Sequence, residues 1–392
     1  MYLITNGQIV TENEILQGYD ILIKDDLIAK IAPHGEIIKS GFEEIVDARG
    51  GFVAPGFIDI HSDYIESMAS PRPSTMIDFN LSMRETEKIL VNHGITTMFH
   101  SLSLWKTDEF SHKPIRCIEN VNKFAEVIQN TQNKKNLIRH RFHARLEIDN
   151  IDAVESLKNY IAQDKVHLIS FMDHTPGQGQ YRNIEIYKKT LRGYNDFTDC
   201  ELDSVMQHHG NKEKITVCML KELSELANEK HIPIASHDDD SVEKLELIKS
   251  LGATISEFPI TLKIARKAKE KGLFTVAGAP NILLGGSHTG NLSAAEAIAN
   301  GTIDILCSDY YPAAMLHAIF ILHKKYKEDL NHMFKLVTIN PARAVKMDHD
   351  IGSIKENKKA DILIIEKIDG DFPVITSVFV DGKLVSRIDY RI

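Results

Sequence analysis

Eight short apolar, β-prone runs alternate with helical stretches along the middle of the chain, and this alternation limits the fold more than any other feature. Helical periodicity is clearest at residues 83–91, 151–162, 241–249, 262–271 and 294–300, between runs at 57–61, 95–102, 137–148, 166–173, 232–237, 253–259, 274–280 and 303–308. Repeated strand–helix alternation builds a parallel sheet, and eight units predict a closed (β/α)8 barrel of the TIM type. An open doubly wound sheet is the alternative, but no GxGxxG pattern follows an early strand.

The two ends of the chain have a different pattern, with short β segments and turns but little helical periodicity. Strand-like segments occur at residues 2–6, 9–10, 20–23 and 27–31, and again at 361–365 and 377–380, where Asp381-Gly382-Lys383 predicts a hairpin turn. Because chain termini often lie close together, we predict a small β-sandwich domain from residues 1–52 and 345–392. The barrel would then take residues 53–344. An insertion at about residues 178–230 exceeds the length of one helix, and we interpret it as part of an active-site lid.

Composition excludes several classes of protein. The 392 residues carry a net charge of −9, which argues against a nucleic-acid partner. No apolar run approaches the ~20 residues of a membrane-spanning helix, and residues 1–7 lack the basic and apolar regions of a signal peptide. The four cysteines, Cys117, Cys200, Cys218 and Cys307, are scattered, which favours reduced thiols. We therefore expect a cytoplasmic protein without membrane or nucleic-acid partners; a homodimer is an assembly that the sequence leaves open.

Metal-binding types of side chain follow the predicted strands. In the segment from Pro55 to Asp63, His61 and Asp63 are separated by one residue, so they point to the same face of a strand. Active sites of barrels lie at the C-terminal ends of the strands, and a mixture of His and carboxylate suits zinc or another borderline divalent ion. One tetrahedral ion does not need six ligands, so we predict two divalent ions. The candidate ligands are His61, Asp63, Glu147, His174, His237 and Asp309.

For other residues near the strand ends, both a structural and a functional interpretation fit the sequence. A single histidine at a strand end is as often a hydrogen-bonded structural residue as a ligand, but a set on independent strands is harder to explain by chance. Three aspartates follow His237: we interpret Asp240 as the cap of the next helix and leave Asp238 and Asp239 open. Arg72, between two prolines, is either a phosphate ligand or a solvated loop residue. The glycines before Ser287 either form a flexible turn or let the backbone approach a phosphate.

The pattern resembles the amidohydrolase superfamily. The resemblance rests on Pro55-Gly56-Phe57-Ile58-Asp59 before the first ligands, on the aspartate after strand eight, and on β segments at both ends of the chain. Within the superfamily, one branch that hydrolyses a ribose 5-triphosphate in phosphonate catabolism is especially similar. Its matching segments are 54–63, 70–73, 94–97, 172–181, 236–239, 278–281, 285–291 and 308–313.

This resemblance implies roles for the candidate residues. His61 and Asp63 would bind the first metal ion, Glu147 would bridge, and His174 and His237 would hold the second. Asp309 would act as general base and then as general acid. Zinc is the expected ion, with iron or manganese as alternatives. The substrate, a ribose triphosphate, would be bound by Arg72, Gln178, Gln180, Arg182, Ser287, His288 and Asn291.

Two departures from the superfamily pattern stand out. The usual first motif is His-x-His, whereas this chain has His61-x-Asp63, so that the aspartate is either a ligand or a contact to ligand or substrate. The superfamily places its paired histidines on strands five and six, whereas our count places His174 and His237 on strands four and five. Either two strands are merged in this count or the insertion displaces one.

The implied activity is hydrolysis of the triphosphate to the 5-phosphate and pyrophosphate. A deacetylase, amidase or deaminase on the same scaffold is the alternative, because a fold does not fix its substrate. A scaffold protein without activity is a further alternative, and it would have lost its ligands, whereas this chain keeps them.

Overall fold

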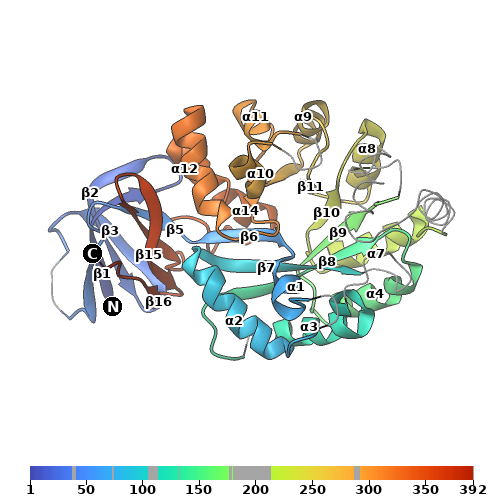
Figure 1. Cartoon of the computed structure of the whole chain (residues 1–392), viewed down its shortest axis with the longest axis horizontal. Helices are drawn as coiled ribbons and strands as arrows, with labels where there is room; N and C mark the ends of the chain where they lie inside the picture. Colours follow the sequence, from blue (N-terminus) through green and yellow to red (C-terminus); the bar gives the residue numbers. More distant parts are fainter. Residues whose placement is uncertain are drawn as a thin grey trace.

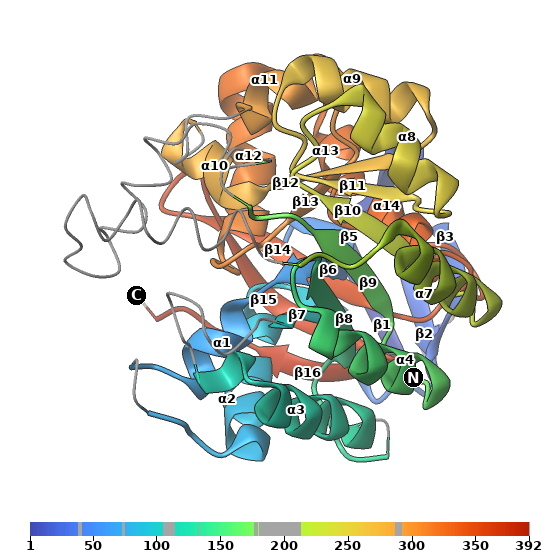
Figure 2. The same ribbon diagram turned by 90° about the vertical axis from the view of Figure 1, so that its right-hand side faces the viewer.

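In the computed structural model, the eight predicted strands form one parallel sheet that curls into a barrel (Figures 1 and 2). The structure describes residues 1–37, 41–72, 75–104, 114–131, 133–175, 179, 213–286 and 292–391. Each strand pairs in parallel with the next along the chain. The strands are β6 (Phe57–Ser62), β7 (Ile95–Leu104), β8 (Arg139–Glu147), β9 (Leu168–Met172), β10 (Ile234–His237), β11 (Ile255–Glu257), β12 (Phe274–Gly278) and β13 (Ile305–Cys307). The predicted barrel and its count of strands are confirmed.

The barrel closes between its first and last strands, at residues that the sequence singled out. Ser62 and Asp309 form a parallel bridge. The Asp309 N–H donates to the His61 carbonyl (3.1 Å), and the Asp63 N–H donates to the Asp309 carbonyl (2.9 Å). The backbone that joins the two edges of the sheet is therefore the backbone of three candidate site residues.

Helices surround the strands in Figure 2. They are α1 (Tyr64–Ala69), α2 (Phe79–Asn92), α3 (Ile118–Thr131), α4 (Val154–Ala162), α7 (Val217–Glu229), α8 (Val242–Ser250), α9 (Leu262–Glu270), α10 (Ala279–Leu284), α11 (Ala294–Ala299), α12 (Ala314–Tyr326), α13 (Leu330–Lys335) and α14 (Ile339–Ala344), with 3-10 turns η1 (Pro114–Arg116) and η2 (Ile151–Ala153). Thr216, Ser241 and Thr261 cap α7, α8 and α9 through their side chains. The interpretation of Asp240 as the cap of α8 is therefore wrong.

Apolar side chains fill the barrel, so that it is a packed core without a pore. One buried cluster contains Ile58, Phe99, Leu168, Ile255 and Ile305 from five different strands. The strands are buried along most of their length, for example all ten residues of β7, because helices cover the outer face. This burial explains why these strands appear in the sequence as continuous apolar runs.

The two ends of the chain meet in a second sheet, on the left of Figure 1, which forms a separate, β-sandwich-like unit. Strand β5 pairs with β1 on one side and with β14 on the other, so that the N-terminal and C-terminal strands share one sheet. Its strands are β1 (Tyr2–Val10), β2 (Ile15–Lys24), β3 (Leu27–Pro33), β4 (Glu44–Asp47), β5 (Phe52–Pro55), β14 (Ile362–Ile368), β15 (Phe372–Val380) and β16 (Lys383–Arg387). The exact residue boundaries between the two units stay a prediction.

The hairpin predicted near the C-terminus joins β15 to β16. Asp381 and Gly382 have φ of 48° and 71°, as a two-residue hairpin turn requires. A Cβ atom on Gly382 would lie 2.0 Å from the Asp25 carbonyl oxygen, because this turn packs against the turn between β2 and β3. Arg139 at the start of β8 forms ion pairs with Asp361 and Asp381, and so ties the barrel to the terminal sheet.

Within the described part of the chain, no helix combines the length and apolar character needed to cross a membrane. Most of the predicted insertion at 178–230 lies outside the described residues; of its described part, α7 occupies Val217–Glu229.

Candidate active site

Four of the predicted ligands come together at the C-terminal ends of the barrel strands. His61 lies on β6, Glu147 ends β8, His174 follows β9 and His237 ends β10. The ring centroids of His61 and His237 are 5.3 Å apart, and those of His174 and His237 are 5.6 Å apart. Glu147 Oε1 lies 2.5 Å from His174 Nδ1. Strand ends that are far apart in sequence therefore place imidazoles and a carboxylate in one cluster.

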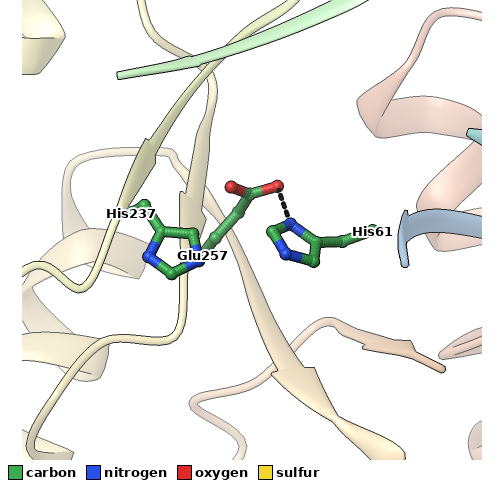
Figure 3. Close-up of side chains that lie close together, drawn as sticks. All are labelled: His61, His237 and Glu257. Carbon is green, nitrogen blue, oxygen red and sulfur yellow. Dashed lines mark hydrogen bonds and ion pairs between the residues drawn. The ribbon is translucent and has the colours of Figure 1, made fainter. Parts of the chain in front are cut away.

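The structure adds a carboxylate that the sequence analysis missed. Glu257 ends β11 and is completely buried, and it accepts a hydrogen bond from His61 Nδ1 at 2.9 Å (Figure 3). Ligand atoms of His61, His237 and Glu257 all lie within 4.8 Å of one another. This group of three is one place where a metal ion can bind.

Glu257 also resolves the question of strand numbers. His174 follows strand four, β9, and His237 ends strand five, β10, and these two strands pair directly with each other. Strand six, where the superfamily has its second paired histidine, ends in Glu257 in this chain. A charged residue at the end of an apolar β run was the sequence signal that could have identified it.

A second group shares His237. Ligand atoms of His174, His237 and Asp238 lie within 4.8 Å of one another, with Asp238 Oδ2 3.0 Å from His237 Nδ1 and 3.6 Å from His174 Nε2. Asp238 thus belongs to the cluster, a role that the sequence left open. Asp239, in contrast, accepts hydrogen bonds from Ser236 and Ser256 and links β10 to β11.

Asp309 and Asp63 lie at the closure of the barrel. Burial raises the pKa of Asp309 to about 7, and the negative charge of Asp63 adds to this effect. Asp63 Oδ2 is 3.9 Å from Arg116 Nη2, and Arg116 also donates from Nε and Nη2 to the carboxylate of Glu66. Asp63, Glu147 and Asp309 adjoin the two groups of three but are not members of them. Their roles as ligands stay predictions.

The protonation states favour binding of a cation. Burial lowers the pKa of His61 to about 4, although Glu257 opposes this, so His61 is neutral at pH 7 and keeps a lone pair. Burial raises the pKa of Glu257, but His61 and His143 outweigh it and hold this pKa well below its usual range. Burial also lowers the pKa of His174, but Glu147 and Asp238 raise it to about 9. In the metal-free protein a proton on His174 thus offsets two carboxylates, as a metal ion can do.

The orientation of His237 gives a direct test of whether the residues fit a metal ion. Its Nδ1 and the Asp238 Oδ2 are both buried and face each other at 3.0 Å, but among the described residues neither atom has a hydrogen bond of good geometry. Buried polar atoms without hydrogen bonds are costly, and a shared divalent cation would satisfy both. Imidazole nitrogens with carboxylate oxygens are the donor set of zinc and similar ions. The described residues therefore fit divalent metal binding; they do not identify the metal.

A chain of hydrogen bonds holds Glu257 in place. Ser170 Oγ donates to Glu257 Oε2 (2.7 Å), and His143 Nε2 donates to Ser170 Oγ (2.5 Å). His143 Nδ1 accepts from Ser101 Oγ (2.9 Å), which in turn accepts from the Ser62 N–H (3.0 Å). These residues come from five of the eight barrel strands, β6, β7, β8, β9 and β11, and such outer contacts orient metal ligands.

The backbone bends sharply where three strands end at this site. Asp238, Phe258 and Asp309 have φ of 52°, 54° and 59°. Asp238 and Phe258 directly follow β10 and β11, and Asp309 is the second residue after β13. Positive φ is unfavourable for a residue with a side chain, most of all for a bulky one such as Phe258. Strained residues of this kind concentrate at functional sites, so these bends support the assignment of the site to this end of the barrel.

Of the predicted substrate-binding residues, the structure describes Arg72 alone. Arg72 is exposed in the loop after α1, its backbone N–H donates to Thr75 Oγ1, and no described contact joins its side chain to the cluster. The other six, Gln178, Gln180, Arg182, Ser287, His288 and Asn291, lie outside the described residues.

Comparisons with known proteins agree with this architecture. Residues 180–385 match the model of the amidohydrolase family, and residues 1–41 match the NagA composite domain. Alpha-D-ribose 1-methylphosphonate 5-triphosphate diphosphatase of Escherichia coli (strain K12) is 31% identical over 399 residues, which cover 98% of this chain and 100% of that protein.

Two solved structures share the fold at low sequence identity. N-acetylglucosamine-6-phosphate deacetylase from Pasteurella multocida superposes with a TM-score of 0.66 at 12% identity, covering 98% of this chain and 99% of the other. Molinate hydrolase gives a TM-score of 0.68 at 14% identity, covering 98% of this chain and 94% of the other. From the family match and the full-length relative together, this chain belongs to the amidohydrolase family.

Proposed function

We propose that the chain is a metal-dependent hydrolase that converts alpha-D-ribose 1-methylphosphonate 5-triphosphate to the 5-phosphate and pyrophosphate. The observation that carries this proposal is the match over the whole length of the Escherichia coli diphosphatase. A match of this extent includes every strand end of the barrel, where the residues that bind substrate lie. A cluster suited to divalent ions supports hydrolysis in general, and the relative supports the choice of substrate.

Two groups of residues would hold the metal ions. One comprises His61, His237 and Glu257, and the other comprises His174, His237 and Asp238. A bound divalent ion supplies positive charge that polarises a phosphoryl group and lowers the pKa of water. Zinc stays the predicted ion, because the ligands are imidazoles and carboxylates.

In the proposed reaction, a water oxygen attacks the phosphorus nearest to the ribose. The new P–O bond forms as the bond from that phosphorus to the bridging oxygen breaks, and pyrophosphate leaves. A carboxylate oxygen of Asp309 accepts a proton from the water and returns it to the leaving oxygen. Asp309 suits this task because its backbone is fixed on both sides by the barrel closure and because a pKa near 7 allows both proton uptake and release.

Hydrolysis of a C–N bond is the second candidate. The match of residues 1–41 to the NagA composite domain is the observation that favours an amidase or deacetylase, and the Pasteurella deacetylase shares the fold. At 12% identity, however, that deacetylase supports the fold alone. An enzyme of this kind would need no cluster of anion-binding groups for a triphosphate.

The test is direct. Purified protein with measured metal content is incubated with the ribose 5-triphosphate substrate, and products are followed by phosphorus NMR, with the Asp309→Asn variant as control. Formation of pyrophosphate and the 5-phosphate by the wild type alone supports the proposal. Release of single phosphates, or turnover only of acylated amines or nucleobases in a parallel panel, refutes it.

A further inference from the structure

Arg145 is a buried cation beside the metal-ligand cluster. Neither the sequence analysis nor the proposed reaction has given this residue a role. It lies on β8 two residues before Glu147 and two after His143, so the three side chains share one face of the strand. Only 8% of Arg145 is exposed. Its guanidinium therefore points to the same end of the barrel as the candidate site.

The contacts that Arg145 makes with described residues do not neutralise its charge. Its Nε donates to Met172 Sδ at 3.2 Å, and its Nη2 lies 3.4 Å from His237 Nε2. A thioether sulfur is a weak acceptor. Among the residues that the structure describes, no carboxylate forms an ion pair with Arg145. By contrast, Arg139 on the same strand is paired with Asp361.

A buried guanidinium without an anion is unfavourable, because the lost hydration of the charge is not replaced. An anionic ligand removes this cost when it binds. Arg145 also lies directly beside the candidate metal ligands, because its Nη2 is 3.4 Å from Nε2 of His237, which belongs to both groups of three. An anion that reaches the metal-ligand cluster next to His237 would therefore also be close to the guanidinium.

We propose that Arg145 binds phosphoryl oxygens of the substrate next to the metal-ligand cluster. The planar guanidinium presents paired N–H donors that match two oxygens of one phosphate. This inference rests on the proposed function and deepens it, since it names the cation that offsets negative charge at the reacting end of the triphosphate. It assigns to the buried Arg145 the task that the sequence gave to Arg72, which is exposed.

The experiment measures anion binding without turnover. Metal-loaded wild type, Arg145→Met and Arg145→Lys are titrated with pyrophosphate by calorimetry, and metal content, kcat and KM are measured in parallel. Loss of charge-assisted hydrogen bonds predicts about 10- to 100-fold weaker pyrophosphate binding for Arg145→Met. A smaller loss is expected for Arg145→Lys, which keeps the charge but not the paired donors. Metal content stays at the wild-type level in both variants.

Arg141→Met is the matched control. Arg141 lies four residues earlier on the same strand, about 13 Å toward the other end of the barrel, and donates to the His140 carbonyl (3.0 Å). The variant removes the same charge from the same face of β8, and pyrophosphate binding is expected to stay within twofold of wild type.

The outcomes separate this inference from the proposed function. Wild-type affinity for pyrophosphate in Arg145→Met overturns the inference, and so does a wild type that binds no pyrophosphate. If metal content falls and saturating metal restores binding, Arg145 only positions His237, which also overturns it. If Arg145 variants lose pyrophosphate but the wild type does not hydrolyse the ribose triphosphate, the anion site stands and the proposed function fails. Should Arg145→Met not fold, Arg145→Lys alone decides through the same titration.

Discussion

The substitution Glu257→Gln tests the residue that the structure added to the candidate metal site. Glu257 is fully buried and accepts hydrogen bonds from His61 Nδ1 (2.9 Å) and Ser170 Oγ (2.7 Å). Glutamine has nearly the same size, so the packing of β11 is kept. The side chain loses its negative charge, and it keeps one acceptor oxygen in place of two. The substitution therefore tests the negative charge of the carboxylate separately from its packing.

The expected loss of metal affinity in Glu257→Gln follows from the geometry. Glu257 is either a direct ligand or the partner that orients His61, since its ligand atom lies within 4.8 Å of those of His61 and His237. Loss of an orienting partner weakens metal binding about 10- to 100-fold, which is about 1.4–2.7 kcal/mol at 1.36 kcal/mol per decade. Loss of a direct ligand costs at least as much. In the metal-free protein, one charge-assisted hydrogen bond of about 1.5–3 kcal/mol is lost as well.

Metal affinity is measured by competition between metal-free protein and a chromophoric chelator, and stability by thermal unfolding of the metal-free protein. Glu87→Gln is the matched control, because Glu87 is also buried and its Oε2 lies 3.3 Å from a histidine nitrogen, His140 Nε2, but on helix α2 outside the site. We expect the control to lose stability and to keep wild-type metal affinity. Equal metal affinity in Glu257→Gln and the wild type would refute the placement of Glu257 in the metal site.

Three further predictions test the site and the fold. Asp309→Asn should keep metal content near normal while turnover falls at least about 100-fold, as for loss of a general base; full activity would exclude this role. Burial lowers the pKa of His167 to about 3, so its contribution to stability is present above the unfolded pKa near 6.5 and is lost as pH falls toward 3. In urea titrations, His167→Gln should therefore reduce the slope of the unfolding free energy against pH by about 1.4 kcal/mol per pH unit between the two pKa values. Above pH 7.5 the slope should not change. A slope equal to that of the wild type between the two pKa values would contradict the argument. Gly382→Ala should lower the free energy of unfolding by at least about 2 kcal/mol, since φ is positive and the new Cβ would lie 2.0 Å from the Asp25 carbonyl oxygen. At Gly272, φ is also positive but no atom lies within 4 Å of an added Cβ. Gly272→Ala should therefore cost only about 1 kcal/mol when both variants are compared by thermal unfolding.

The sequence predicted the barrel because its signals are local. Each strand of the barrel is covered on both faces and so needs a run of apolar residues, as in β7, where all ten residues are buried. Turn residues mark the terminal sheet in the same way, as Asp381 and Gly382 do for the last hairpin. These patterns depend on only a few neighbouring residues, so they can be recognised in the sequence without knowledge of the fold.

The sequence also selected residues that the fold brings together. His61 and His237 were chosen because each ends a predicted strand, and parallel strands of a barrel end at the same face. Their rings are 5.3 Å apart in the structure. The step from strand order to a shared site needs only the topology, which the alternation of strands and helices had already indicated.

Only the tertiary structure decided which carboxylates join these histidines. Glu257 and His61 are separated by 196 residues, and their contact depends on the closure of the barrel and the register of its strands. Asp238 and Asp239 are neighbours in sequence, yet Asp238 reaches the histidines while Asp239 holds two serines. The positive φ of Asp238 turns the chain between them. Local sequence determines which residues form a strand, whereas the direction of a side chain beyond the strand end depends on backbone dihedrals and packing that distant segments impose.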